Sequence, residues 1–555
     1  MKEKTDQTAR GEETPNSPDI GAEIRVYTRE VQPDCYPEGL ARSVHIACRT
    51  EGGWEPLNRN YGILFAEGRV SRENTIVPMG VRNPGIFRME DGRIGIAGER
   101  VHEDGSEDAD IRGKMLLWTT RDLIHFSECG PVDRTSLPAV LPDTLAVERS
   151  LAEEALRWWR PIVHTGTTVP ETIRIRSGEE LDAVRARLDY SDGSWREKRV
   201  LWNKDGLCFD RPGSYQVHGT ITQQAFRFPL ARGYGDPVLF PWEGKWYFIA
   251  TNDNLNDIGL YVREADRPED LFREGIEEHL ILPFSPERGF EQTFWAPEFH
   301  VIGGDLYILF AVSGHVWGPQ CHLMKKKKNG RITDPDGWEN PVRVLRRDGR
   351  PLAEDAITLD MTYICAESGS YVVWSYREHI GTALDSGSML YIAAINAQEP
   401  WRLTSEPVLL TRPLLGWENV SGTINNEGPH AFLRNGKIFL TYSGGSANRY
   451  TYALGLLTAD TGSNLMDLRS WHKSITPVLT FYSVKGEYGP GHNSFYTDED
   501  GDLMIAYHAE TGLDESLRCD GIRRVHFRLD GTPYFELSTS EDLVREEVQT
   551  TVLTN

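Results

Sequence analysis

Acidic side chains recur at similar distances along the second half of the chain. Asp236, Glu298, Asp360 and Glu427 each open a short apolar stretch, and His492 opens a fifth. The steps between these positions are 62, 62, 67 and 65 residues. Carboxylates are costly to bury unless they are paired, and clustered carboxylates shift one another's pKa values, as is common at active sites. The pattern therefore indicates either acid–base chemistry or acids that cap strand ends.

Hydrolysis of a glycosidic bond needs two carboxyl groups that face each other across the bond. One donates a proton to the leaving oxygen, while the other activates water or attacks the sugar. Other chemistries have less support, because the sequence contains no Walker loop, dinucleotide glycine fingerprint, HExxH or Gly-x-Ser-x-Gly motif.

The elements that must position these acids form a repeat of about 65 residues. After each opening, a Gly-containing turn leads to a second strand, expected at 245–250, 305–312, 370–376, 437–442 and 502–508. Third strands are expected at 258–264, 321–325, 389–395, 452–459 and 522–529. Short antiparallel strands at near-constant spacing are typical of β-propeller blades, with an array of β-sandwiches as the alternative. In a propeller the opening strands line one channel, so their first residues converge.

Two further modules precede the repeat. Asn83 opens another blade-like unit, with strands at 93–98 and 114–120, and an amide there cannot accept a proton. Whether this unit joins the ring as a sixth blade or packs beside it stays open. A segment with strands at 184–190, 200–202 and 212–220 resembles small bacterial Ig-like modules with a "YSDG … V.W … PG.Y.V.GT" pattern.

The predicted fold class is therefore all-β. We expect an N-terminal tail over 1–19, a blade-like unit over 20–145, an inserted Ig-like β-sandwich over 146–228, a five-bladed β-propeller over 229–540 and a C-terminal tail over 541–555.

Charge and cysteine usage restrict the partners and the compartment. The formal net charge of −23 repels phosphate backbones and anionic membranes, so neither nucleic acid nor a membrane is expected as a partner. No apolar run is long enough to span a bilayer. Seven scattered cysteines without a CxxC pair indicate reduced thiols and a cytoplasmic protein. Residues 1–19 show no signal peptide, and the protein would be secreted if a signal had been removed.

Five motifs in this order, at blade spacing, carry a family resemblance. They are Asp236-Pro237, Trp295-Ala296-Pro297-Glu298, Asp360 before an apolar strand, Glu427-Gly428-Pro429 and the segment 489–495. Over residues 233 to 535 the chain resembles glycoside hydrolase family 43, which includes five-bladed propeller arabinofuranosidases, xylosidases and arabinanases. The resemblance implies an inverting mechanism with three acids, in which Asp236 is the general base, Glu427 the general acid, and Asp360 orients Glu427 and keeps its pKa high.

The resemblance also implies a sugar pocket and an ion. Trp295 and Phe294 are expected to contact substrate, although Trp295 would alternatively pack between blades. Glu298 is expected either to bind sugar hydroxyls or to brace Asp236. His492 is expected near a structural calcium or sodium ion in the central channel, while the reaction itself requires no cofactor.

The fourth and fifth blades narrow the expected substrate. Segments 426–429, 440–443, 453–459 and 488–495 resemble the exo-acting α-L-arabinofuranosidase branch, whereas His508-Ala509-Glu510 departs from the basic residue that the branch often has there. We expect release of terminal α-L-arabinofuranose from plant cell-wall arabinan or arabinoxylan oligosaccharides. A β-D-xylosidase and a non-catalytic carbohydrate-binding propeller are the alternatives.

Overall fold

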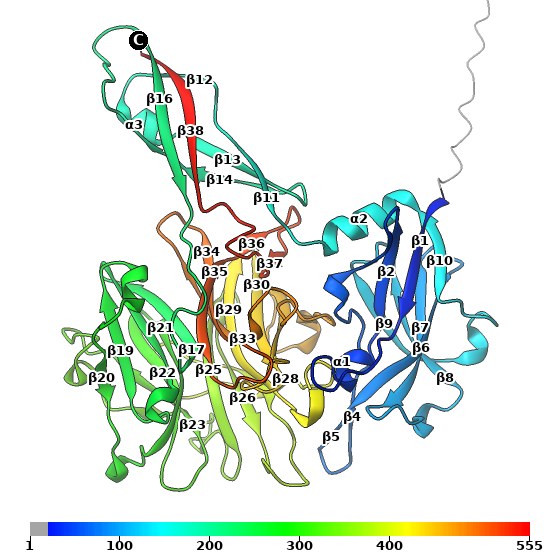
Figure 1. The fold of residues 1–555 in the computed structure, drawn as a ribbon. Helices are drawn as coiled ribbons and strands as arrows, with labels where there is room; N and C mark the ends of the chain where they lie inside the picture. The colour runs from blue at the N-terminus through cyan, green and yellow to red at the C-terminus, as the bar shows by residue number, and fades with distance from the viewer. Residues whose placement is uncertain (1–19, 555) are drawn as a thin grey trace, which may run out of the picture.

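The computed structural model describes residues 20–554 and consists mainly of β-strands in three modules (Figure 1). None of the helices in this part of the chain is long and apolar enough to cross a membrane. The predicted tail over residues 1–19 lies outside the described residues.

Five antiparallel sheets form a ring, as the repeat predicts. The innermost strands β17, β21, β25, β29 and β33 each contact the next, and β33 contacts β17, which closes the ring at five blades. The blades comprise β17 (Tyr234–Trp242), β18 (Lys245–Asn252), β19 (Leu260–Ala265) and β20 (His279–Leu282); β21 (Gln292–Ile302), β22 (Asp305–Ser313), β23 (Gln320–Lys325) and β24 (Val342–Arg343); β25 (Ile357–Ala366), β26 (Gly369–Arg377), β27 (Met389–Ala394) and β28 (Val408–Thr411); β29 (Asn426–Arg434), β30 (Lys437–Gly444), β31 (Ala453–Asp460) and β32 (His472–Lys473); and β33 (Tyr488–Thr497), β34 (Leu503–Glu510) and β35 (Cys519–Arg524).

The chain that enters the first blade closes the fifth. Backbone hydrogen bonds join Leu230 N to Asp520 O (2.9 Å), Asp520 N to Ala231 O (2.9 Å) and Gly233 N to Arg518 O (2.8 Å). The entering segment thus covers the edge of β35, which would otherwise present unpaired backbone groups.

A β-bulge occurs at the same place in every innermost strand. The residue at the bulge has a left-handed backbone in all five: Asp236 (φ 60°), Ala296 (45°), Asp360 (52°), Gly428 (54°) and His492 (41°). Such conformations are uncommon for residues other than glycine, and bulges often redirect side chains at active sites. The bulge therefore aims one residue from each blade at a shared level of the channel.

The N-terminal unit packs beside the ring and is not a sixth blade. Tyr36 and Phe65 share a hydrophobic core with Leu415 and Trp417 next to the fourth blade. One sheet has the order β6 (Met79–Arg88), β7 (Ile94–His102), β8 (Lys114–Thr120), β9 (Phe126–Asp133). The other has the order β10 (Thr144–Glu148), β1 (Ile20–Tyr27), β2 (His45–Thr50), β3 (Gly53–Pro56).

Strand β6 nevertheless has the same bulge as the innermost strands of the blades. Its register shifts between Arg82 and Gly85, and Asn83 has φ 50°, so Asn83 occupies the same kind of bulge as Asp236. The unit also contains α1 (Glu38–Ala41) and the hairpin of β4 (Arg69–Val70) and β5 (Ile76–Val77). It extends beyond the predicted boundary at 145, because α2 (Arg149–Trp159) buries Ala152 and Ala155 in its core.

The third module stands away from the ring (Figure 1) and contains two sheets around one core. One sheet has the order β11 (His164–Thr168), β13 (Arg185–Tyr190), β14 (Trp195–Arg199), and α3 (Gly178–Asp182) precedes β13 in the chain. The second has the order β12 (Thr172–Ile175), β38 (Arg545–Thr554), β16 (Gly213–Thr222), β15 (Leu201–Trp202).

Residues 545–554 form a strand, in contrast to the tail predicted over 541–555. Strand β38 pairs antiparallel with all of β16 and parallel with β12, and Val552 is fully buried between the sheets. The predicted insertion therefore lacked a central strand, which the chain supplies only after the propeller. A short hairpin of β36 (His526–Phe527) and β37 (Pro533–Tyr534) precedes it.

Candidate active site

The predicted acids converge where the innermost strands begin. Asp236, Asp360 and His492 occupy bulge positions, and Glu427 directly precedes the bulge residue Gly428. Asp236, Asp360 and His492 are buried, whereas Glu427 is partly exposed. A substrate can thus reach Glu427 from solvent while the other groups stay desolvated.

Asp236 is held as a carboxylate by four neighbours. Thr251 Oγ1 donates to Oδ2 (2.5 Å), and Arg518 Nη1 donates to Oδ1 (3.0 Å). His492 Nδ1 and His508 Nδ1 lie 3.0 and 3.3 Å from Oδ1. Burial alone would raise the pKa of Asp236, but the charges of Arg518 and His492 outweigh it and hold the pKa well below its usual range.

Glu427 has the opposite electrostatic setting. Tyr452 OH donates to Glu427 Oε1 (3.0 Å), but burial and the charge of Asp360 raise the pKa of Glu427 to about 7. Asp360 Oδ2 accepts from Gly428 N (3.0 Å), which ties this acid to the residue after Glu427. Burial and the charge of Asp236, opposed by His492, raise the pKa of Asp360 to about 6.

His492 lies against Asp236 and next to Gly428. Burial disfavours its protonation, but the charges of Asp236 and Asp360 prevail and raise its pKa to about 9, with a further contribution from Glu427. A Cβ on Gly428 would meet its ring at 2.8 Å, so only glycine allows this approach. All three carboxyl groups predicted from sequence therefore act on the pKa of one imidazole.

Asp360→Asn should move the alkaline limb of the pH profile to lower pH. Above about pH 6 Asp360 is ionised, and its charge keeps the proton on Glu427; without that charge, the pKa of Glu427 falls. Asn tolerates the left-handed backbone at position 360. The measurement is kcat/KM against pH on an oligosaccharide, and an unmoved alkaline limb would exclude the influence of Asp360 on Glu427.

Several site residues were not found from the sequence. Arg518, His508, Tyr452 and Thr251 contact the acids. Thr251 and His508 lie on second strands, whereas Tyr452 and Arg518 directly precede β31 and β35. The blade repeat could have indicated the residues on second strands, because each second strand ends beside the start of its innermost strand, where the acids lie. Arg518 supplies a basic group at the site although Glu510 stands where the resemblance expects one.

Trp295 packs against a small cluster that includes Leu359, the residue before Asp360, whereas Phe294 is enclosed in a larger core. Trp295 is partly exposed, and its Nε1 donates to Asp257 Oδ2 (2.8 Å). Phe294 is 0% exposed and packs in the core of the first two blades, so the prediction that it contacts substrate does not hold. Adjacent strand residues face opposite sides, which explains why only one of this pair reaches the site.

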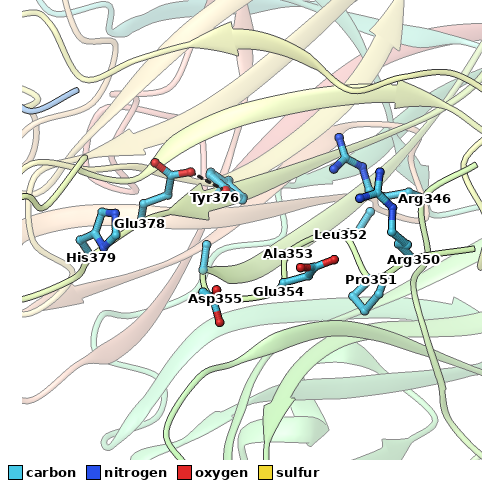
Figure 2. A pocket seen from close by; sticks show the side chains of 11 residues that line it. Arg346, Arg350, Pro351, Leu352, Ala353, Glu354, Asp355, Tyr376, Glu378 and His379 are labelled. Atoms are coloured by element: carbon cyan, nitrogen blue, oxygen red, sulfur yellow. Dashed lines mark hydrogen bonds between the residues drawn. The ribbon is translucent and has the colours of Figure 1, made fainter. Parts of the chain in front are cut away.

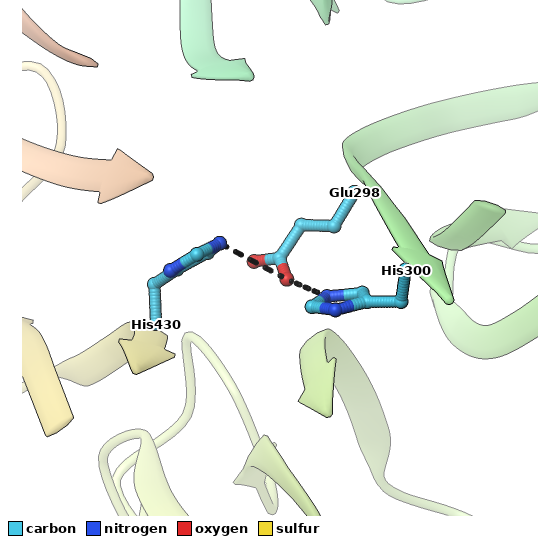
Figure 3. Close-up of side chains that lie close together, drawn as sticks. All are labelled: Glu298, His300 and His430. Atoms are coloured by element: carbon cyan, nitrogen blue, oxygen red, sulfur yellow. Dashed lines mark hydrogen bonds and ion pairs between the residues drawn. The ribbon is translucent and has the colours of Figure 1, made fainter. Parts of the chain in front are cut away.

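Glu298 lies one step deeper in the channel than the bulge residues. The bulge in its strand falls at Ala296, two residues earlier, so Glu298 is not equivalent to Asp236. Figure 3 shows its carboxylate between two imidazoles: His300 Nε2 is 2.6 Å from Oε2 and His430 Nε2 is 3.9 Å away. Among described contacts Glu298 makes none to Asp236; Ala296 N instead donates to Thr251 Oγ1 (2.8 Å), which binds Asp236.

The calcium or sodium ion expected near His492 stays a prediction. Nδ1 of this ring lies 3.0 Å from Asp236 Oδ1, so that nitrogen is already engaged by a carboxylate. Within residues 20–554, Glu298, His300 and His430 are the cluster with metal-ligand spacing. Its two nitrogens and one carboxylate also differ from the oxygen ligands that calcium prefers.

Comparisons with known proteins identify the family of the chain. A family model described as glycosyl hydrolases family 43 matches residues 277–533. The extracellular exo-α-(1→5)-L-arabinofuranosidase of Streptomyces chartreusis is 33% identical over 300 residues, which cover 53% of this chain and 85% of the relative. The identically named enzyme of Streptomyces avermitilis is 30% identical over 328 residues, covering 57% of this chain and 64% of the relative.

Among solved structures, an α-L-arabinofuranosidase from Lactobacillus brevis is 30% identical, with a TM-score of 0.48, over 56% of this chain and 95% of that one. The chain thus spans less than two thirds of the Streptomyces avermitilis enzyme but most of the Streptomyces chartreusis enzyme. With its ring of five blades, the chain belongs to glycosyl hydrolase family 43.

Proposed function

We propose that this protein is an inverting, exo-acting α-L-arabinofuranosidase. The observation that carries the proposal is the opposite electrostatic setting of two carboxyl groups around His492. Asp236 is held ionised, whereas the pKa of Glu427 is raised to about 7. Two carboxyl groups whose pKa values are driven apart are suited to act as base and acid at one pH.

In the proposed mechanism, the terminal sugar binds over the bulge residues. The Glu427 carboxyl gives its proton to the glycosidic oxygen as the bond from that oxygen to the anomeric carbon breaks. A water molecule attacks the anomeric carbon from the opposite face and passes its proton to Asp236. The released sugar has the inverted configuration, and proton exchange with water restores both carboxyl groups.

The roles of the other residues follow from their contacts. Asp360 holds the segment after Glu427 through Gly428 N and keeps Glu427 protonated. Trp295 offers its ring beside the site as a surface for the sugar. We propose that the hydrolysis requires no metal, because the two carboxyl groups account for both proton transfers.

The choice of arabinose rests on the relatives. Two are named exo-α-(1→5)-L-arabinofuranosidases, and a third, from Humicola insolens, is named α-L-arabinofuranosidase 43 and is 34% identical over 303 residues. We therefore propose plant cell-wall arabinan or arabinoxylan oligosaccharides as substrates. A β-D-xylosidase is the second candidate, since it would use the same acids.

The predicted cellular location can be compared with that of the relatives. The predicted cytoplasmic location rests on seven scattered cysteines without a CxxC pair, and all seven are free in the structure. The relatives give that prediction no support, because two of them are named extracellular.

The proposed function is tested by p-nitrophenol release from α-L-arabinofuranoside and β-D-xyloside, together with proton NMR of the first anomer formed. We expect faster release from the arabinofuranoside and an inverted product. Faster cleavage of the xyloside would favour the second candidate. No hydrolysis of either glycoside or of arabino-oligosaccharides would leave a binding propeller as the function.

A further inference from the structure

A groove opens between the second and third blades, outside the central site. Its volume is about 320 Å³, within the range of small-molecule sites. Figure 2 shows Glu378 and His379 on one side and Arg346 and Arg350 on the other, with Glu354 and Asp355 between them.

The groove lies on the same face as the catalytic carboxyl groups. Its wall residue Asp355 lies five positions before Asp360, so at about 3.3 Å per residue the two are at most roughly 17 Å apart. On the other wall, Arg377 precedes Glu378 and donates to Asn425 Oδ1 (2.8 Å), two residues before Glu427. The groove thus lies within the length of an oligosaccharide bound at the central site.

The groove suits a neutral ligand with many hydroxyl groups. Three carboxylates face two guanidinium groups, and Arg350 is already paired with Asp348 (2.7 Å), so an anion is not favoured. The side chains provide charged acceptors and forked donors, the groups that bind hydroxyls in both directions. The ring of Tyr376 adds an apolar face, held edge-on by Tyr391 at 5.3 Å.

Glu378 is fixed from two modules. Tyr376 OH donates to its Oε1 (2.7 Å), and Asn74 Nδ2 donates to its Oε2 (3.3 Å). Asn74 lies between β4 and β5 of the N-terminal unit, with φ 67°. Arg412 of the propeller holds Asn74 through its Oδ1 (2.8 Å) and its backbone oxygen (3.0 Å). The hairpin therefore reaches across to the groove.

We propose that this groove is an accessory subsite for the distal part of a neutral oligosaccharide whose terminal sugar occupies the central pocket. Asn74 is a positioning residue that orients Glu378 within it. The proposal rests on the proposed function and gives the N-terminal unit a part in substrate selection.

The first test compares kcat/KM for α-1,5-linked arabinopentaose with kcat/KM for the p-nitrophenyl arabinofuranoside. Loss of one hydrogen bond of ordinary strength should lower this ratio about three- to tenfold in Glu378→Ala, through KM. Asn74→Asp keeps a residue that tolerates positive φ but repels Glu378, and it should lower the ratio in the same way. Glu274→Gln, an exposed change in the first blade, should leave the ratio unaltered.

The second test measures arabinopentaose binding by calorimetry in an Asp236→Asn background, where turnover is removed. Adding Glu378→Ala should weaken the Kd three- to tenfold, whether or not the wild type hydrolyses the sugar. Unchanged Kd and unchanged ratio overturn the subsite. A wild type that binds arabinopentaose through Glu378 but cleaves neither substrate would instead remove the proposed function and leave the groove as a binding site.

Discussion

Glu427→Gln should slow the hydrolysis of arabino-oligosaccharides by about 10²- to 10⁴-fold, the usual contribution of a general acid. The amide keeps the size of the side chain and a hydrogen bond to Tyr452 but has no proton to give to the leaving oxygen. A p-nitrophenyl glycoside should be slowed much less, because p-nitrophenolate leaves without protonation. The ratio of the two rate losses is the measurement.

The pH profile of this variant provides an independent check. In the wild type, kcat/KM on an oligosaccharide should fall as pH rises through about 7, where Glu427 loses its proton. The residual activity of the variant on the same oligosaccharide should lack this fall. Equal losses on both substrates would contradict the assignment of Glu427 as the acid, and Glu274→Gln serves as the matched control.

Asp236→Asn should lower kcat by a comparable 10²- to 10⁴-fold on both kinds of substrate. Activation of water is needed whatever the leaving group, so a good leaving group cannot compensate for a missing base. The amide cannot take a proton from water, and Arg518 then faces no carboxylate at this position. The measurement is kcat on the oligosaccharide and on the aryl glycoside.

The choice of asparagine separates chemistry from folding. Position 236 has φ 60°, which strains most residues, whereas Asn adopts this conformation readily. The protein itself shows the fit: Asn83, also followed by proline, occupies the equivalent bulge of β6 with φ 50°. If the variant keeps the thermal midpoint of the wild type and also keeps its kcat on the aryl glycoside, Asp236 is not the base.

The repeat predicted the propeller because each blade carries its own strand pattern. It also predicted Asp236, Asp360 and Glu427, since each acid opens a strand and opening strands line one channel. The bulge register was not visible in the sequence. The sequence pattern treated Glu298 as equivalent to Asp236, because both acids open a strand. In the structure the bulge of that strand falls at Ala296, so Glu298 lies further along the channel.

Contacts between distant segments were beyond the sequence pattern. Arg518 reaches Asp236 because residues 230–233 pair with the edge of the fifth blade, nearly 290 residues away. Likewise, β38 pairs with β16 although the whole propeller separates the two strands in sequence. No nearby segment of the sequence therefore indicated a partner for β38. Such pairings are specified by shape and burial in the assembled protein, not by neighbours in sequence.

The position of β38 sets the order in which the modules can be completed during synthesis. When residues 164–222 leave the ribosome, the partner for the inner edge of β16 has not been translated, and more than 300 residues of propeller must follow first. The ring can close before that strand arrives, whereas the outlying module must wait for it. This module is therefore completed last, and its β16–β38 pairing joins the segment before the first blade to the segment after the fifth.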